Sequence, residues 1–291
     1  MTAVRLARFR HEPLPDFVHP GRGAGFPTLA AATCVLGRPR EMVEKLTAQA
    51  RALALLGALF WAALIYLFFA ATITARIKPG FTRSINGGWL VAVVSTQALA
   101  VLMTLLIAND PAAGPGWLFG ALCLYLLGGA LYLLIITLVV SRMVFFPLRA
   151  REFTPPYWID MGALAITTLA GITLIKTMTA HGLYTDLIPT LKVFVVFAWI
   201  AGTWWIPVIF FLEIWRHWTI PWKYHAGYWS LVFPLGMHVV CTWQLAEVFQ
   251  LTFLKVMPEV FIWLAWATWA VTFVGMCIKV TRAFLLNRSW R

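Results

Sequence analysis

Two kinds of apolar span alternate along almost the whole of this 291-residue chain. Spans rich in Leu, Phe and Trp take turns with spans rich in Gly, Ala, Ser and Thr. Hydrophobic residues make up 61% of the sequence, charged residues make up 12%, and the mean hydropathy is +0.81. Because a helix needs roughly 20 apolar residues to cross a bilayer core about 30 Å thick, the sequence predicts an all-α integral membrane protein.

The alternation also predicts how the spans pack. Bulky side chains suit helices that face lipid, whereas small and weakly polar side chains suit helices that pack closely or line a cavity. We therefore expect helical hairpins with one inner and one outer helix each, repeated four times at a spacing of about 65–70 residues. A ring of inner helices around a pore fits this pattern better than a soluble enzyme with an anchor. The eight expected spans are residues 24–37, 52–74, 86–107, 117–145, 156–176, 187–213, 228–249 and 257–280.

The basic residues predict the orientation, because Lys and Arg collect in cytoplasmic loops. If the short span 24–37 crosses the membrane, 16 Lys and Arg residues lie on one side and 6 on the other, with Lys192 inside a span. If it does not cross, the split is 12 to 10. The first arrangement fits the rule better and predicts a multi-pass protein of the cell membrane with both termini, including segment 1–18, in the cytoplasm. The net charge of +12 then reflects loops that meet anionic headgroups, not a nucleic-acid partner.

The sequence carries no motif for catalysis, metal binding or cofactor binding. It lacks GxSxG and HExxH patterns, and its four cysteines lie in apolar spans without CxxC spacing. Only His238 among the six histidines is deep in a span, so a pair of haem ligands on facing helices is missing. We expect no enzyme activity and no cofactor. The scarcity of acids argues against a cation route, and a basic cytoplasmic rim suits anions better.

The charged residues within or beside the spans are few, and most have a structural interpretation. Asp160 follows two prolines at the start of a span, where the helix dipole favours an acid, although a role in transport stays open. Lys192 and Glu247 lie near helix ends, from which long side chains reach the interface. Glu213 and Arg216 are spaced for a local ion pair.

Three segments resemble a known family. They read PPYWIDMGALAITTLAG at 155–171, YWSLVFPLGMH at 228–238 and HPGRGAGFPTLAAATCVLG at 19–37. Over essentially the whole chain from about residue 15, they are similar to the tellurite-resistance/dicarboxylate transporter family. This family includes TehA-type tellurite-resistance permeases, fungal malate permeases, sulfite efflux pumps and the plant slow anion channels.

The resemblance implies ten helices in five hairpins, trimers with one pore per subunit, and a pore closed by a phenylalanine on the ninth helix. The matching position here is Phe233, immediately before Pro234. A neutral ring at a proline kink can block a narrow apolar pore, although packing is the ordinary role of such a residue. Because only eight spans are visible, we expect a single transporter domain over 1–291 without the family's first hairpin. Two explanations stay open: the start codon is misassigned, or this is a shortened member of the family.

Helical periodicity predicts which other residues share the side of the helix that carries Phe233. If Phe233 faces a pore, residues at i−4, i+3 or i+4, and i+7 share its side of the helix. Small and polar residues at mid-depth of the other inner spans are further candidates. The complete set of candidate pore-lining residues is Trp229, Pro234, Gly236, Met237, Val240, Thr167, Thr168, Ser95, Thr96, Pro27 and Thr28.

His238 departs from the resemblance, since relatives commonly carry an aromatic residue, often Tyr, at this position. It lies five residues after Phe233, about 140° around the helix. If Phe233 faces the pore, we therefore expect His238 to face a neighbouring helix.

The sequence thus predicts an anion channel or transporter for C4-dicarboxylates such as malate, or for small inorganic anions, with a possible tellurite-resistance or sulfite-efflux role. Its expected partners are these anions, the lipid bilayer and two further copies of the chain in a homotrimer. Two alternatives stay open: a membrane-embedded enzyme acting on lipid-linked substrates, and a membrane assembly protein that transports nothing.

Overall fold

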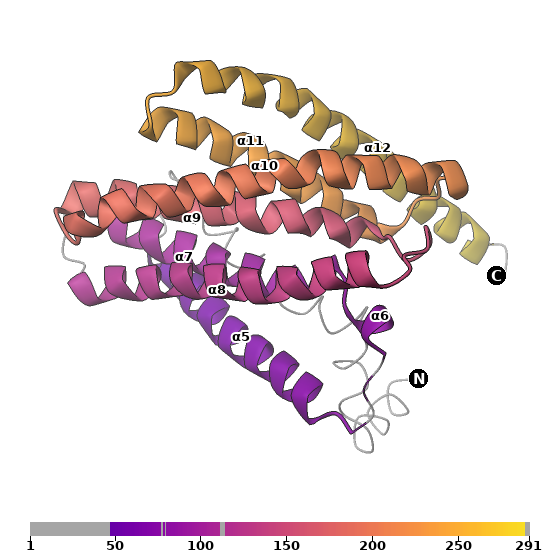
Figure 1. Ribbon diagram of the computed structural model, residues 1–291, viewed down its shortest axis with the longest axis horizontal. Helices are drawn as coiled ribbons and strands as arrows, with labels where there is room; N and C mark the ends of the chain where they lie inside the picture. Colours follow the sequence, from indigo (N-terminus) through magenta and orange to yellow (C-terminus); the bar gives the residue numbers. More distant parts are fainter. Residues whose placement is uncertain (1–46, 77, 79, 111–113, 289–291) are drawn as a thin grey trace. The chain divides into compact units, whose positions relative to one another are not determined.

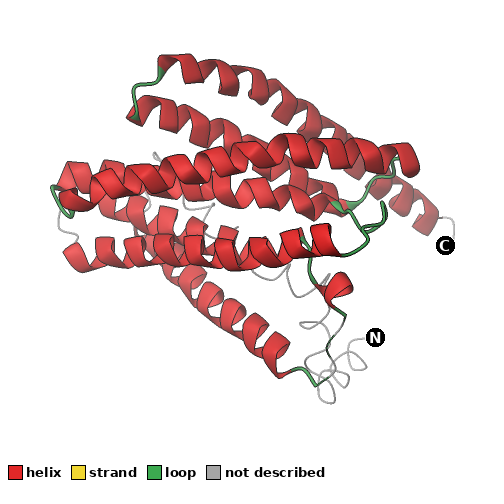
Figure 2. Ribbon diagram, in the orientation of Figure 1, coloured by secondary structure: helices red, strands yellow, loops and turns green. Residues whose placement is uncertain are grey.

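The computed structural model describes residues 47–76, 78, 80–110 and 114–288. Every regular element in these ranges is a helix, and loops connect the helices (Figure 2). Seven of the described helices are long and apolar enough to cross a membrane, and they match seven of the eight expected spans. The prediction of an all-α integral membrane protein is confirmed, whereas the expected span 24–37 and segment 1–18 lie outside the described residues.

The chain divides into two compact units between Phe146 and Pro147. In the first unit, coloured indigo to magenta in Figure 1, α7 packs along α8 and also contacts α5. Its elements are α5 (Thr47–Thr74), α6 (Phe81–Ser84), η2 (Gly87–Leu90), α7 (Val91–Ala108) and α8 (Pro115–Phe145).

A glycine allows α7 and α8 to approach closely. The side chain of Gln97 on α7 is fully buried, and its Nε2 donates a hydrogen bond to the backbone oxygen of Tyr125 on α8 at 3.0 Å. A Cβ atom on Gly128 would lie 2.3 Å from that nitrogen. The absence of a side chain at Gly128 therefore makes room for the carboxamide between the two helices.

A buried arginine holds the end of α8. The Nε atom of Arg142 donates to the backbone oxygen of Thr82 on α6 at 2.9 Å, and Nη1 donates to that of Phe146 at 3.4 Å. Carbonyl oxygens can satisfy a buried guanidinium, which is costly to bury without partners.

In the second unit, α9 packs against both α10 and α11, and α11 packs against α12. Gly182, with φ of 64°, ends α9 in the left-handed conformation that suits a glycine C-cap. The elements are η3 (Pro155–Trp158), α9 (Ile159–His181), η4 (Thr185–Leu187), α10 (Ile188–Thr219), η5 (Ala226–Tyr228), α11 (Trp229–Val248), η6 (Thr252–Lys255) and α12 (Val256–Arg288).

Helices α7, α9 and α11 begin in the same way. Each follows a short 3-10 turn, and a tryptophan lies in that turn or at the first position of the helix: Trp89, Trp158 and Trp229. Four residues after each tryptophan, the chain carries Val93, Gly162 and Phe233, respectively. Among these three starts, only α11 therefore carries a large side chain at that level.

Burial alternates along the chain as the sequence predicts. The apolar windows of α7, α9 and α11 are 83%, 94% and 44% buried, whereas those of α5, α8, α10 and α12 are 17%, 28%, 28% and 11% buried. The first three are called the buried helices below, and the other four the exposed helices. Large apolar side chains such as Trp263 are exposed because this surface suits lipid, not water.

Candidate functional site

The two buried helices of the second unit meet where a proline interrupts α11. Pro234 lies inside α11 and cannot donate the backbone hydrogen bond that a helix needs at this position. A Cβ atom on Gly162 of α9 would lie 2.7 Å from Cγ of Pro234. The glycine and the proline therefore bring α9 and α11 into close contact, one residue beyond Phe233.

One side of α11 packs against its neighbours. Thr242 accepts a hydrogen bond from Nε1 of Trp199 on α10 at 3.0 Å. The buried ring of His238 lies against Phe261 of α12, with ring centroids 5.8 Å apart. The expectation that His238 faces a neighbouring helix is confirmed.

The opposite side of α11 forms a stripe that is half-buried or exposed. At about 100° per residue, its members lie within about 60° of Phe233 around the helix. The stripe consists of Trp229, Phe233, Gly236, Val240, Gln244 and Glu247, and is called the α11 stripe below. It includes the candidates Trp229, Gly236 and Val240 that periodicity groups with Phe233, whereas the candidates Met237 and Pro234 are buried.

The α11 stripe is uncharged from Trp229 to Val240 and ends in a polar cluster. Lys176, near the end of α9, donates a short hydrogen bond from Nζ to Oε1 of Gln244, and Nζ lies 3.9 Å from Oε2 of Glu247. The indole of Trp243 donates to Oε1 of Glu247 at 3.0 Å. The Nζ atom of Lys255 lies 4.8 Å from the centroid of the Trp243 ring. We call Lys176, Gln244 and Glu247 the lysine cluster.

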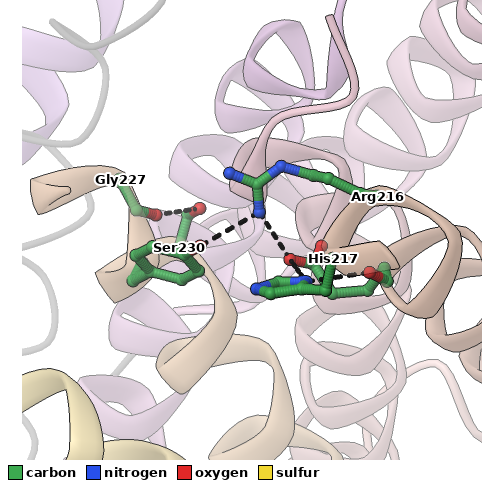
Figure 3. A network of polar contacts seen from close by, with 6 residues as sticks. Arg216, His217, Gly227 and Ser230 are labelled. Carbon is green, nitrogen blue, oxygen red and sulfur yellow. Dashed lines mark hydrogen bonds and ion pairs between the residues drawn. The ribbon is translucent and has the colours of Figure 1, made fainter. Parts of the chain in front are cut away.

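A second polar network lies at the other end of α11 (Figure 3). Arg216, in the last turn of α10, donates from Nη1 to Oε1 of Glu213 at 2.7 Å and to the hydroxyl of Tyr228 at 3.0 Å. The backbone oxygen of Glu213 lies 2.8 Å from Nδ1 of His217, and Ser230 donates to the backbone oxygen of Gly227 at 2.6 Å. The expected Glu213–Arg216 pair is confirmed, and Tyr228 connects it to the start of α11.

The candidates on α7 are buried and make their hydrogen bonds within the first unit. Thr96 accepts a hydrogen bond from Nε1 of Trp61 on the exposed helix α5 at 2.8 Å. Ser95 is fully buried and donates to a backbone oxygen of its own helix at 3.0 Å.

The candidates on α9 are both buried and donate to their own helix, Thr167 at 2.7 Å and Thr168 at 2.9 Å. Thr168 lies one turn beyond Leu164, against which Gly202 of α10 packs, so Thr168 lies on the α10 side. Pro27 and Thr28 lie outside the described residues.

Asp160 is fully buried in the first turn of α9, where the helix dipole favours a carboxylate. Neither of its carboxylate oxygens has a hydrogen-bond partner. Helical geometry places it about 160° from Gly162, away from the contact with α11. Asp160 is therefore not a member of the α11 stripe or of the lysine cluster.

Sequence reasoning missed the lysine cluster. It did not single out Lys176, and it treated Glu247 as a helix-end side chain that reaches the interface. The i, i+3 spacing of Gln244 and Glu247 places both on one side of α11, but no pattern in the chain assigns Gln244 a partner 68 residues away. In the described part of the chain, no group of three His, Cys, Asp or Glu side chains could hold a metal ion.

Alternating buried and exposed apolar helices, with a half-buried stripe on α11, define a multi-pass membrane protein of the transporter or channel class. The chain belongs to the voltage-dependent anion channel family, whose model matches residues 1–277. The family resemblance predicted from the motifs is thereby confirmed.

Relatives from two other organisms are also membrane proteins. An uncharacterized membrane protein of Mycobacterium tuberculosis is 39% identical over 163 residues, which cover 55% of this chain and 81% of the relative. An uncharacterized transporter of Methanocaldococcus jannaschii is 23% identical over 282 residues, which cover 95% of this chain and 78% of the relative.

Proposed function

We propose that this chain moves anions through a pathway lined by the α11 stripe and gated by Phe233. The observation that carries the proposal is the stripe itself: the side of α11 opposite Thr242 and His238 is half-buried or exposed, and it runs from Trp229 to Val240 without a charge. The family supplies the class of solute, because it consists of anion channels and transporters.

Phe233 suits a gate for two reasons. Its side chain is half-buried on the α11 stripe, whereas the corresponding positions on α7 and α9 carry the smaller residues Val93 and Gly162. Pro234 follows directly, and a proline inside a helix loosens the backbone hydrogen bonding around it. A rotation of one ring could then open or close a narrow apolar passage.

We propose C4-dicarboxylates or small inorganic anions as the substrates, with a physiological role in tellurite resistance or sulfite efflux as one form of this activity. We also propose a homotrimer with one pathway in each subunit, both termini in the cytoplasm, and a ring of inner helices around each pore. Thr96 and Thr168 face α5 and α10, so we assign them to packing between buried and exposed helices.

The gate is tested by Phe233→Ala in proteoliposomes. Removing the Phe233 ring opens space in the proposed passage and changes no charge. Anion flux should therefore rise by roughly threefold or more, with little change in selectivity. Flux of nitrate and of malate is measured for each variant after its thermal unfolding has been checked, because truncating a packed ring typically costs a few kcal/mol.

The matched control is Phe194→Ala, since Phe194 is 49% exposed on the exposed helix α10. This variant should leave flux at the wild-type level. If folded Phe233→Ala carries flux equal to or below that of the wild type, Phe233 is a packing residue and the gate assignment is wrong.

A further inference from the structure

The described buried helices contain a single Lys or Arg residue. The sequences of α7 and α11 have none, and that of α9 has Lys176 alone. Any anion that moves along these helices therefore meets one fixed cation on them, near the end of α9.

This ammonium group is accessible to a solute. The Lys176 side chain is 46% exposed and that of Glu247 is 41% exposed, so water reaches both. An ion pair as exposed as this one stabilises a fold only weakly. The Lys176–Glu247 pair is therefore a poor candidate for a structural lock between α9 and α11.

The lysine cluster lies on the same side of α11 as Phe233. Gln244 and Glu247 are members of the α11 stripe, 11 and 14 residues beyond Phe233, or roughly 16–21 Å along the helix. The cluster thus stands where the proposed pathway opens at the far end of α11.

Glu247 is held in place by its own helix. The Trp243 indole, four residues earlier, donates to one carboxylate oxygen at 3.0 Å, and the other carboxylate oxygen faces Lys176. A carboxylate oxygen and an amide oxygen thus occupy positions around the ammonium that the oxygens of a carboxylate or nitrate ion could take.

We propose that Lys176 is an anion-capture site at this mouth of the pathway, and that Glu247 is a built-in competitor that an incoming anion displaces from the ammonium. The site takes small anions with oxygen acceptors. This inference rests on the proposed function, and it adds a residue that sets apparent affinity at a distance from the gate.

The test measures nitrate and malate flux into proteoliposomes as a function of anion concentration. Lys176→Gln should raise the half-saturating concentration by roughly three- to tenfold, with the larger effect at low ionic strength. Glu247→Gln should lower it by about threefold, because the ammonium loses its internal competitor. Lys176→Arg keeps the charge and should stay close to the wild type.

Lys192→Gln is the matched control. Lys192 lies near the same end of the unit, but on the exposed helix α10, with its Nζ 5.7 Å from the centroid of the Phe249 ring. Removing this charge should leave the half-saturating concentration unchanged. If Lys192→Gln raised the half-saturating concentration as much as Lys176→Gln does, only the general surface charge would matter. That result would overturn the proposal of a capture site at Lys176.

A different result is expected if the Lys176–Glu247 pair only stabilises the fold. In that case Lys176→Gln and Glu247→Gln would both lower thermal stability and maximal flux, and Glu247→Gln would not lower the half-saturating concentration. That outcome, or an unchanged half-saturating concentration in Lys176→Gln, overturns the capture site and leaves the proposed function standing. Absence of anion flux in the wild type overturns the proposed function and, with it, the capture site.

Discussion

At the scale of single residues, burial and hydrogen bonding separate side chains that pack between helices from side chains that are left half-buried or exposed. His238 and Phe233 are five residues apart on one helix, yet they lie on different sides of it. The His238 ring contacts Phe261 and its Nε2 atom has no hydrogen-bond partner, whereas Phe233 lies on the α11 stripe.

We predict that His238→Tyr folds and leaves the pH profile of anion flux unchanged between about pH 5 and 8. The substitution keeps an aromatic ring against Phe261, and it breaks no hydrogen bond at Nε2. Flux measured across this pH range checks the prediction. A clear shift of the profile would show that the histidine titrates in the transport path.

At the scale of secondary-structure elements, glycines set the distance between helices. Helices in lipid gain little from apolar burial between them, so close backbone approach and polar contacts stabilise their association. In the first unit Gly128 admits the carboxamide of Gln97, and in the second Gly162 admits the ring of Pro234.

We predict that Gly128→Ala lowers the free energy of unfolding by about 1–3 kcal/mol, because its Cβ would overlap Nε2 of Gln97. Gly129→Ala is the matched control, since a Cβ there meets no atom within 4 Å. Thermal unfolding of the purified variants in detergent measures both changes. Equal stabilities for the two variants would show that α7 and α8 adjust to the added methyl group without cost.

At the scale of the whole molecule, the distribution of charge predicts the orientation in the membrane. The net charge is +12, and if the expected span 24–37 crosses the membrane, the uneven split of Lys and Arg predicts cytoplasmic termini. With this orientation, we expect the loop between α7 and α8 to lie outside.

Reporter fusions test this topology. A fusion after Arg291 should report the cytoplasm, and a fusion at Asp110 should report the outside, because the positive-inside rule acts on the short loops between spans. If the Arg291 fusion reports the outside, the eight-span topology is wrong.

The amino-acid sequence by itself determined the seven described spans and the alternation of buried and exposed helices. Long apolar runs must form helices in lipid, because a helix satisfies its backbone hydrogen bonds internally. The 100° periodicity was also enough to place Phe233 and His238 on different sides of α11.

Only the tertiary structure decided which helices meet. Periodicity identifies the sides of a helix, but it does not identify the neighbour that covers each one. The bonds from Trp61 to Thr96 and from Trp199 to Thr242 join residues 35 and 43 positions apart, and the bond from Lys176 to Gln244 joins residues 68 apart. These contacts depend on where helices cross, which is set by close approaches such as that of Gly162 and Pro234.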